Sequence, residues 1–300
     1  MKKNLAIIVL NYNNYELTYD CVKGLEDIGV NFPIIIVDNN SLNNSFEFLK
    51  DKFKTYDNIH VIKNLVNSGY ANGNNYGIRY ALDKINNLDY IAIMNPDVKI
   101  TYKEIFYNLM SKLSENEDIA GITGIMINNR DINLYGTFWD IPKNIDVILN
   151  YSTIIRKIRD LRKKKILKVK ENFDNIAYAG VITGSFFIIK KNIFEKVGFF
   201  DVNTFLYNEE NILAIKLKNI GYQLSVSIND YFFHNHIYTT KLNLKGKLKI
   251  EKILFDSTKY LIKNYYDKNL IIFLYLIRFI KIIEIIIFYL KERVRKGSNK

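Results

Sequence analysis

Short apolar runs alternate with amphipathic segments through the first hundred residues. Residues 15–29 place apolar side chains at helical spacing and end at Gly29, which suits a helix stop. A Gly- and Asn-rich segment opens a second helix that runs to about residue 87. The apolar runs have the length of buried strands and lie at 5–11, 33–41, 58–64 and 90–97. This alternation predicts an α/β fold with a mainly parallel central sheet.

The second half of the chain is less regular. Residues 177–191 indicate a strand on either side of a Gly-Ser turn, and residues 197–222 indicate an aromatic loop leading into a helix. From about residue 241 the pattern is helical and separate from what precedes it. We therefore expect one α/β domain over 1–238 and a helical tail over 239–300.

Three of the predicted strands end on polar side chains. Asn11 closes the first strand, Asp38 the second, and Asn95 with Asp97 the fourth. In open α/β sheets ligands bind outside the carboxyl ends of the strands, so these side chains should line one shared cleft. Pro96 cannot donate to a sheet ladder, which is typical of the point where a strand leaves the core.

The composition suits a large folded domain in a reducing compartment. Hydrophobic residues make up 48% of the chain, and its single cysteine, Cys21, excludes an internal disulfide framework and a cysteine-rich zinc site. We interpret Cys21 as a small buried side chain on a helix. Lys2 and Lys3 precede only a short apolar run that we assign to the first strand, so we expect no secretory signal and a cytoplasmic protein.

The net charge of +12 is concentrated in two segments. Residues 156–170 carry a net charge of +8 and residues 239–300 one of +10, which leaves the rest of the chain net acidic. Such segments suit either nucleic acid or an anionic membrane surface. Because aromatic side chains are not interleaved with the basic run at 156–170, we expect no nucleic-acid partner.

Six motifs, in this order and spacing, resemble glycosyltransferase family 2, and most closely its rhamnosyltransferase-like branch, which builds bacterial surface polysaccharides. The resemblance covers about residues 4–238 and implies a GT-A fold, with a nucleotide-sugar half over about 1–100 and an acceptor half over about 101–238. The motifs are IVLNYN, VDNNS, NSGYANGNNYG, NPDV, TGSFFIIKK and GFFDVNTFLYNEEN.

The resemblance implies a donor site in the first half of the chain. A carboxylate at Asp38 would accept a hydrogen bond from the N–H of a uracil or thymine ring, although Asp-Asn-Asn-Ser is also good turn chemistry. Gly69, Gly73 and Gly77 let backbone approach a ligand closely and a helix start favours phosphate, but the Lys-Ser/Thr ending of a P-loop is missing. The donor-binding residues that we predict are Asn11, Asp38, Asn40, Asn67, Gly69, Asn75, Asn95 and Asp97.

Asn95-Pro96-Asp97 matches the position of the family's Asp-x-Asp motif. A departing nucleoside diphosphate carries at least two negative charges, which a hard divalent cation neutralises. Asp97 would supply a carboxylate oxygen to Mg²⁺ or Mn²⁺, while Asn95 replaces the first aspartate and would bind ribose or a metal-bound water. The alternative is a plain Asn-Pro-Asp turn, which does not explain why it ends a central strand.

Glu209 and Glu210 begin the helix after the aromatic loop. Neighbouring helical residues point about 100° apart, so both cannot face one pocket equally. Glu210 shares a stripe with Leu213 and Leu217, whereas Glu209 shares one with Lys216, so we expect Glu210 to face inward. Glu210 also matches the family's catalytic base, usually an aspartate. The alternative is that both acids only complement the helix dipole.

The remaining candidates lie in the second half of the chain. His234 and His236 are two apart and would face one side of a strand, where some GT-A enzymes use a histidine as a further metal ligand. The His-Asn-His run lacks the rest of a nuclease motif. Trp139 would stack on a sugar or belong to the core. The predicted acceptor-binding residues are Gly184, Ser185, Asp201 and Trp139.

These observations predict an inverting glycosyltransferase. It would move a sugar from dTDP-rhamnose or a UDP-sugar to a glycan acceptor, free or lipid-linked, in bacterial surface polysaccharide synthesis. One alternative is a sugar-phosphate nucleotidyltransferase, but the basic Gly-rich signature that it needs after the first strand is absent from NYNNYEL. The other is a non-enzymatic nucleic-acid-binding protein that uses the basic segments.

The tail contains an apolar helical stretch at 269–296 that charged residues interrupt. Arg278, Lys281 and Glu284 recur every three residues and form one polar stripe on the helix. Three charges at mid-depth make a membrane span unfavourable. The helix could lie in the headgroups, or pack on the rest of the protein or on a second subunit in a homodimer. The charge of the tail favours peripheral attachment of residues 241–300 to the inner face of the plasma membrane.

Overall fold

The structure, a computed structural model, describes residues 4–128, 131–160, 175–234 and 242–297, and for 157–160 and 292–297 only the backbone. The chain forms two compact units. The sheet unit contains residues 1–141, 167–202 and 209–237, and the helical unit contains 142–166, 203–208 and 238–300. We expected a single division at residue 238. In the structure, residues 142–166 and 203–208 also belong to the helical unit. Most of the basic run 156–170 lies outside the described residues.

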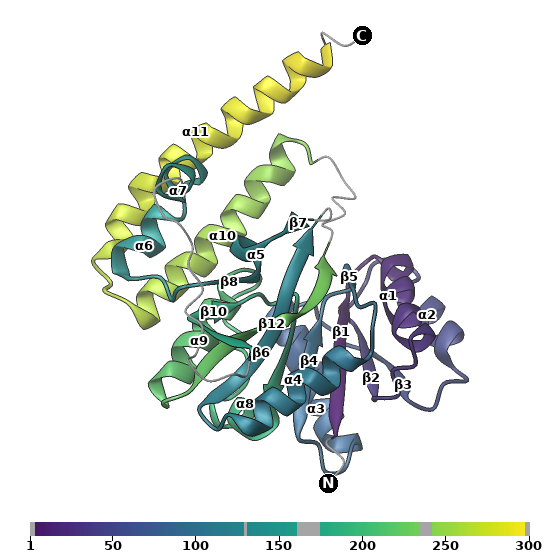
Figure 1. The fold of residues 1–300 in the computed structure, drawn as a ribbon. Coiled ribbons are helices and arrows are strands. Elements are labelled where there is room, and N and C mark those ends of the chain that lie inside the picture. Colours follow the sequence, from purple (N-terminus) through teal and green to yellow (C-terminus); the bar gives the residue numbers. More distant parts are fainter. Residues whose placement is uncertain (1–3, 129–130, 161–174, 235–241, 298–300) are drawn as a thin grey trace. The chain divides into compact units, whose positions relative to one another are not determined.

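The described part of the sheet unit is built on a ten-stranded sheet in the order β3-β2-β1-β4-β11-β6-β12-β5 (Figure 1). Two short strands lie off this path, since β7 pairs with β6 and β9 with β12, while β8 and β10 form a separate pair. The strands are β1 (Leu5–Asn11), β2 (Ile34–Asp38), β3 (Ile59–Lys63), β4 (Tyr90–Met94), β5 (Val98–Lys99), β6 (Ile119–Asn128), β7 (Asp131–Ile132), β8 (Phe138–Trp139), β9 (Ile176–Ala179), β10 (Val181–Ile182), β11 (Phe186–Lys190) and β12 (Gln223–His234).

Helices cover both faces of this sheet, as the apolar runs predict. One face of the sheet packs with α1, α2 and α4, and the other packs with α3, α8 and α9. The helices of the sheet unit are α1 (Tyr15–Asp27), α2 (Ser45–Phe53), α3 (Tyr70–Lys84), α4 (Glu104–Glu115), α5 (Leu134–Thr137), α8 (Lys191–Lys196) and α9 (Glu209–Asn219). The predicted α/β class is confirmed.

Two glycines bring α3 close to the sheet. A Cβ at Gly77 would lie 2.6 Å from Val37 Cγ2 and 2.8 Å from Ile8 Cγ2, and one at Gly73 would lie 2.5 Å from Leu10 Cδ1. These two glycines of the NSGYANGNNYG motif therefore serve helix packing on β1 and β2 rather than a ligand.

The sheet changes direction at its centre. β1, β2, β3 and β4 are parallel, as expected, but β11 runs antiparallel between β4 and β6. β12 then runs parallel to β6 and pairs antiparallel with β5 at its far end. This topology brings the segment before β11 and the end of β12 to the edge where β4 ends.

The helical unit consists of α6 (Asn144–Leu149), α7 (Thr153–Asp160), α10 (Leu244–Tyr265) and α11 (Leu270–Gly297). α10 and α11 pack against each other, and α6 and α7 contact α11. Within residues 242–297 and the other described ranges, no helix has the length and apolar content needed to cross a membrane.

Candidate active site

The carboxyl ends of β1 and β2 hold a buried polar pair. Asn11 and Asp38 are opposite each other in the register, and Asn11 Nδ2 donates to Asp38 Oδ2 at 2.8 Å. The backbone N–H of Ser41 donates to the other oxygen, Asp38 Oδ1, at 3.0 Å, while Thr18 Oγ1 donates to Asn11 Oδ1 at 2.8 Å. Asp38 is fully buried, so a nucleobase would have to reach the lone pairs that remain on these oxygens.

An asparagine cluster orders the loop before α3. Asn67 Oδ1 accepts hydrogen bonds from Gly69 N and from Asn39 Nδ2, both at 3.1 Å. Gly69 has a φ of 101° at the start of α3, and Asn40 has a φ of 58°. This cluster places Asn67 and Gly69 at the same edge of the sheet as Asp38, because Asn39 follows β2 directly.

Asn75 does not join this cluster. It is 1% exposed, and its amide forms a pair with the backbone of Phe200: Nδ2 donates to the Phe200 carbonyl at 2.9 Å and Oδ1 accepts from its N–H at 3.2 Å. The whole Asn75 amide is thereby used in anchoring the loop before α9. The predicted contact between Asn75 and the nucleotide sugar would therefore require both hydrogen bonds to Phe200 to break.

The Asn95-Pro96-Asp97 segment is a tight turn between β4 and β5. Val98 N donates to Asn95 O at 3.1 Å, so Pro96 occupies the second position of the turn. His234, the last residue of β12, pairs with Val98 across the antiparallel ladder. This register places His234 Nε2 3.1 Å from Asp97 Oδ1, with Asp97 20% exposed and His234 nearly buried.

The Asp97–His234 pair fits a divalent cation as two of its ligands. A carboxylate suits Mg²⁺ or Mn²⁺, and an imidazole is a common ligand of transition metals. Within the described residues no group of three His, Cys, Asp or Glu side chains converges, and His236 lies outside those residues. The donor diphosphate and water would therefore have to supply the remaining ligands.

Tyr70 links this turn to the segment before β11. Its hydroxyl lies 2.8 Å from the Gly184 carbonyl and 3.2 Å from Asn95 Oδ1, and Asn95 N donates to Ser185 O at 2.7 Å. Burial raises the pKa of Tyr70 well above its usual range, and the negative charges of nearby Glu210, Glu209 and Asp97 add to the effect. Sequence reasoning missed Tyr70; its only signal was an aromatic residue inside a Gly- and Asn-rich motif.

Both candidate bases face inward at the start of α9. Glu209 is 4% exposed and Glu210 is half-buried, so the expectation that Glu210 is the more inward acid is wrong. The reason is that Glu209 also shares the buried face of Ile212 and Leu213. Among the described residues, Glu209 Oε2 has no hydrogen-bond partner.

The two carboxyl groups differ in how firmly they hold a proton. Burial raises the pKa of Glu209 well above its usual value, and the charge of Glu210 adds to this. Burial raises the pKa of Glu210 as well, but backbone hydrogen bonds at Glu210 and Gly184 oppose the shift. A backbone hydrogen bond at Glu209 opposes its shift too, but the pKa of Glu209 is raised the more strongly, because the charge of Glu210 adds to the effect of burial there.

The predicted acceptor residues divide into two groups. A Cβ at Gly184 would lie 2.7 Å from Glu210 Oε1, so the Gly184–Ser185 segment lies directly against that acid. The Ser185 hydroxyl lies 2.9 Å from Thr183 Oγ1. Trp139 instead packs on the hydrophobic core and donates from Nε1 to Asn211 Oδ1 at 2.8 Å. Asp201 follows the buried Phe200 in the loop before α9 and is half-buried.

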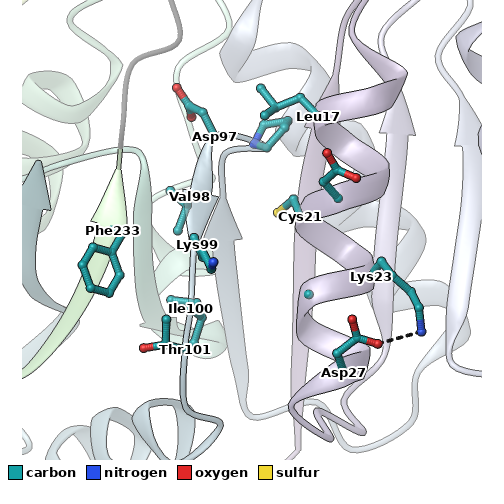
Figure 2. A pocket seen from close by; sticks show the side chains of 13 residues that line it. Leu17, Cys21, Lys23, Asp27, Asp97, Val98, Lys99, Ile100, Thr101 and Phe233 are labelled. Carbon is teal, nitrogen blue, oxygen red and sulfur yellow. Dashed lines mark ion pairs between the residues drawn. The ribbon is translucent and has the colours of Figure 1, made fainter. Parts of the chain in front are cut away.

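A groove of about 930 Å³ runs between α1 and residues 96–101 (Figure 2). Leu17, Cys21, Val98 and Phe233 contribute apolar surface, and Asp97 lies at one end. Burial, together with the charge of Asp97, raises the pKa of the Cys21 thiol to about 12. Cys21 is therefore a buried thiol rather than a nucleophile, which agrees with its interpretation as a small buried side chain.

Residues 6–198 match the sequence profile described as glycosyl transferase family 2. The chain belongs to glycosyltransferase family 2. The family match includes Asn11, Asp38, Asp97 and Ser185, whereas α9 with both glutamates and the end of β12 lie beyond it.

Two curated proteins are similar to this chain. The low-salt glycan biosynthesis hexosyltransferase Agl10 of Haloferax volcanii is 30% identical over 213 residues, which cover 70% of this chain and 60% of that protein. The dTDP-rhamnosyl transferase RfbF of Shigella flexneri is 27% identical over 221 residues, which cover 74% and 65%. This chain thus spans less than two thirds of either relative. The predicted resemblance to the rhamnosyltransferase-like branch is confirmed.

Solved structures support the GT-A fold of this family 2 member. GalNAc-T7 with UDP, GalNAc and Mn²⁺ has a TM-score of 0.60 at 12% identity, covering 86% of this chain and 48% of that one. The mannosyltransferase PcManGT of Pyrobaculum calidifontis, with GDP-Man and Mn²⁺, has a TM-score of 0.59 at 12% identity, covering 92% and 69%. At this identity the likeness shows the fold alone. The predicted GT-A fold is confirmed.

Proposed function

We propose that this protein is an inverting glycosyltransferase that moves a sugar from a nucleoside-diphosphate donor to a glycan acceptor. The observation that carries the proposal is a single cluster in which Tyr70 joins the Asp97 turn to the Gly184 segment, with Glu210 against that segment. A group suited to the leaving diphosphate thus lies near a carboxylate suited to an acceptor hydroxyl.

The proposed reaction begins with the acceptor. Glu210 takes the proton of an acceptor hydroxyl, whose oxygen attacks the anomeric carbon as the bond to the diphosphate breaks. The raised pKa of Glu209 favours its neutral form, which would add no second negative charge beside the base. Asp97 and His234 would hold a divalent cation, which when bound supplies positive charge to the leaving diphosphate.

The donor is proposed from the relatives and from the fold. A dTDP-sugar such as dTDP-rhamnose, or a UDP-sugar, agrees with the name of the Shigella relative and with the UDP in one structural neighbour. Use of Mg²⁺ or Mn²⁺ agrees with the Mn²⁺ in both neighbours. The acceptor would be a surface glycan, free or lipid-linked, used at the inner face of the plasma membrane.

The test is a donor screen with the purified protein. We expect one nucleotide sugar among UDP-, dTDP- and GDP-sugars to bind and to be hydrolysed slowly with Mn²⁺, releasing the nucleoside diphosphate. The same preparation is then given a sugar phosphate and nucleoside triphosphates. Release of pyrophosphate in that assay, with no sugar released in the first, would show a nucleotidyltransferase and overturn the proposal.

A further inference from the structure

The charged stripe of α11 faces the interior of the helical unit. Arg278 Nε donates to Glu251 Oε1 of α10 at 3.0 Å and Nη2 donates to Oε2 at 3.2 Å, while the Tyr151 hydroxyl donates to Glu251 Oε1 at 2.5 Å. Glu251 is 4% exposed, so this pairing keeps a buried carboxylate satisfied.

Glu284, which follows Arg278 on α11, is also a buried carboxylate with hydrogen-bond donors around it. The Ser152 hydroxyl donates to it, and so does the backbone N–H of Thr153 at 3.1 Å. Lys281 contacts Thr153 Oγ1 and lies 3.7 Å from Glu284. The three charges that interrupt the apolar sequence of the tail are therefore paired inside the helical unit and do not point to water.

The opposite side of α11 is a broad apolar surface, which we call the α11 stripe. At 100° per residue its members span about 160°, and between Leu270 and Leu290 this arc contains no charged residue; its centre lies roughly opposite Lys281. Their exposed fractions run from 37% at Ile286 to 69% at Ile272. Its members are Ile272, Phe273, Tyr275, Leu276, Phe279, Ile280, Ile283, Ile286, Ile287 and Leu290. A contiguous apolar surface of this size marks an interaction site.

The charge around the α11 stripe indicates what covers it. Residues 239–300 have a net charge of +10, and two of their five acids, Glu251 and Glu284, are buried and paired. The exposed lysines include Lys245, Lys249 and Lys252 of α10 and Lys291 of α11. An anionic partner is therefore favoured, whereas a second copy of the chain would bring two strongly basic segments together.

We propose that the α11 stripe inserts into the headgroup and acyl boundary of an anionic bilayer, with the lysines of the helical unit against lipid phosphates. Arg278, Lys281 and Glu284 of α11 face inward and the α11 stripe faces outward, which is the polarity required of a surface that meets lipid. This inference deepens the proposed function, on which it rests for a lipid-linked acceptor. It keeps the expected peripheral attachment of residues 241–300 and assigns the contact with lipid to the apolar side of α11.

The experiment is flotation of the full-length protein with vesicles of phosphatidylcholine alone or with one quarter phosphatidylglycerol. The variant carries Ile272→Gln, Leu276→Gln and Phe279→Gln, which all lie in the α11 stripe. Each side chain is at least 62% exposed, so we expect the fold to stay unchanged. Ile132→Gln on β7, 69% exposed in the sheet unit, is the matched control. Circular dichroism and donor hydrolysis are measured on every protein, so loss of catalysis is separated from loss of binding.

We expect the wild type and the control to bind the anionic vesicles, less at high salt, and the triple variant to bind at least tenfold more weakly with unchanged hydrolysis and helicity. In a Phe279→Trp protein, brominated acyl chains should quench the new fluorescence. A triple variant that binds as tightly as the wild type would overturn the proposal. So would a wild type that ignores vesicles and elutes as a dimer, which the triple variant converts to a monomer.

Discussion

Replacing Gly184 with alanine tests whether Glu210 is the catalytic base. The new Cβ would lie 2.7 Å from Glu210 Oε1, 3.1 Å from its Cγ and 3.2 Å from its Cδ. Ordinary contacts begin at 3.4 Å, so the carboxylate must move by roughly 0.7 Å. Because Cγ and Cδ are also too close, turning the carboxylate alone does not relieve the contact, and the whole side chain must shift.

The expected effect is on turnover more than on stability. A misplacement of about 1 Å at a reacting group costs about 100-fold, so a shift of roughly 0.7 Å should lower kcat by about 10- to 100-fold. Overpacking should cost about 1–3 kcal/mol of unfolding free energy. The assay is sugar transfer at saturating donor, with KM for the donor unchanged because β1 and β4 separate β2, which ends at Asp38, from β11, which follows Gly184.

A shorter acid supplies the control. Glu210→Asp withdraws the carboxylate by one methylene, so the double variant Gly184→Ala/Glu210→Asp should be more active than the product of the two single effects predicts. Full turnover in Gly184→Ala, or strictly multiplicative losses in the double variant, would refute the assignment of Glu210 as the base.

Three further outcomes are expected. Asp97→Ala should abolish transfer with the fold intact, as judged by circular dichroism, and excess EDTA should inhibit the wild type; undiminished activity in either case would exclude the metal role. Glu210→Gln should lower kcat by about 10²- to 10⁴-fold with little change in affinity for the nucleotide sugar, and Glu209→Gln should lower kcat less. If Glu209→Gln lowers kcat more, Glu209 is the base. Glu209→Gln should also change the pH dependence of stability. Because the folded-state pKa of Glu209 is raised, the wild type loses unfolding free energy as the pH rises from the ordinary carboxyl range through that raised pKa, and the glutamine does not. The Tm of Glu209→Gln should therefore exceed that of the wild type at pH 8 and approach it near pH 4; parallel Tm curves would contradict the buried neutral acid.

β1, β2 and β4 were predictable because each is buried on both sides of the sheet, whereas β3 is an edge strand with four half-buried residues. A strand such as β2, with all five residues buried, appears in the sequence as an unbroken apolar run. β6 gave no such signal, since Gly121 and Gly124 interrupt it. A Cβ at Gly124 would lie 2.8 Å from Asp230 O on the irregular part of β12, a close approach that no local pattern reveals.

The candidate site was predictable where residues follow strands and unpredictable where distant segments meet. Asp38 and Asp97 were found from the ends of β2 and β4. Tyr70 was missed because its role depends on contact with Gly184, 114 residues away. For α11 the periodicity defined the polar stripe correctly, but periodicity cannot tell which stripe faces the protein; the partners of Glu284, 130–132 residues away, decide that.

The position of β11 between β4 and β6 has a consequence for how the chain is made. β4 acquires its second neighbour only when Phe186–Lys190 have been synthesised, roughly 90 residues after β4 itself, which takes about 5–20 s at an elongation rate of about 5–20 residues per second. During that interval the five buried residues of β4 form an open apolar edge that can pair with another chain. A fragment that ends near residue 100 would keep this edge permanently, so the nucleotide-sugar half should aggregate when expressed alone, and nascent chains should need a chaperone until β11 has been added.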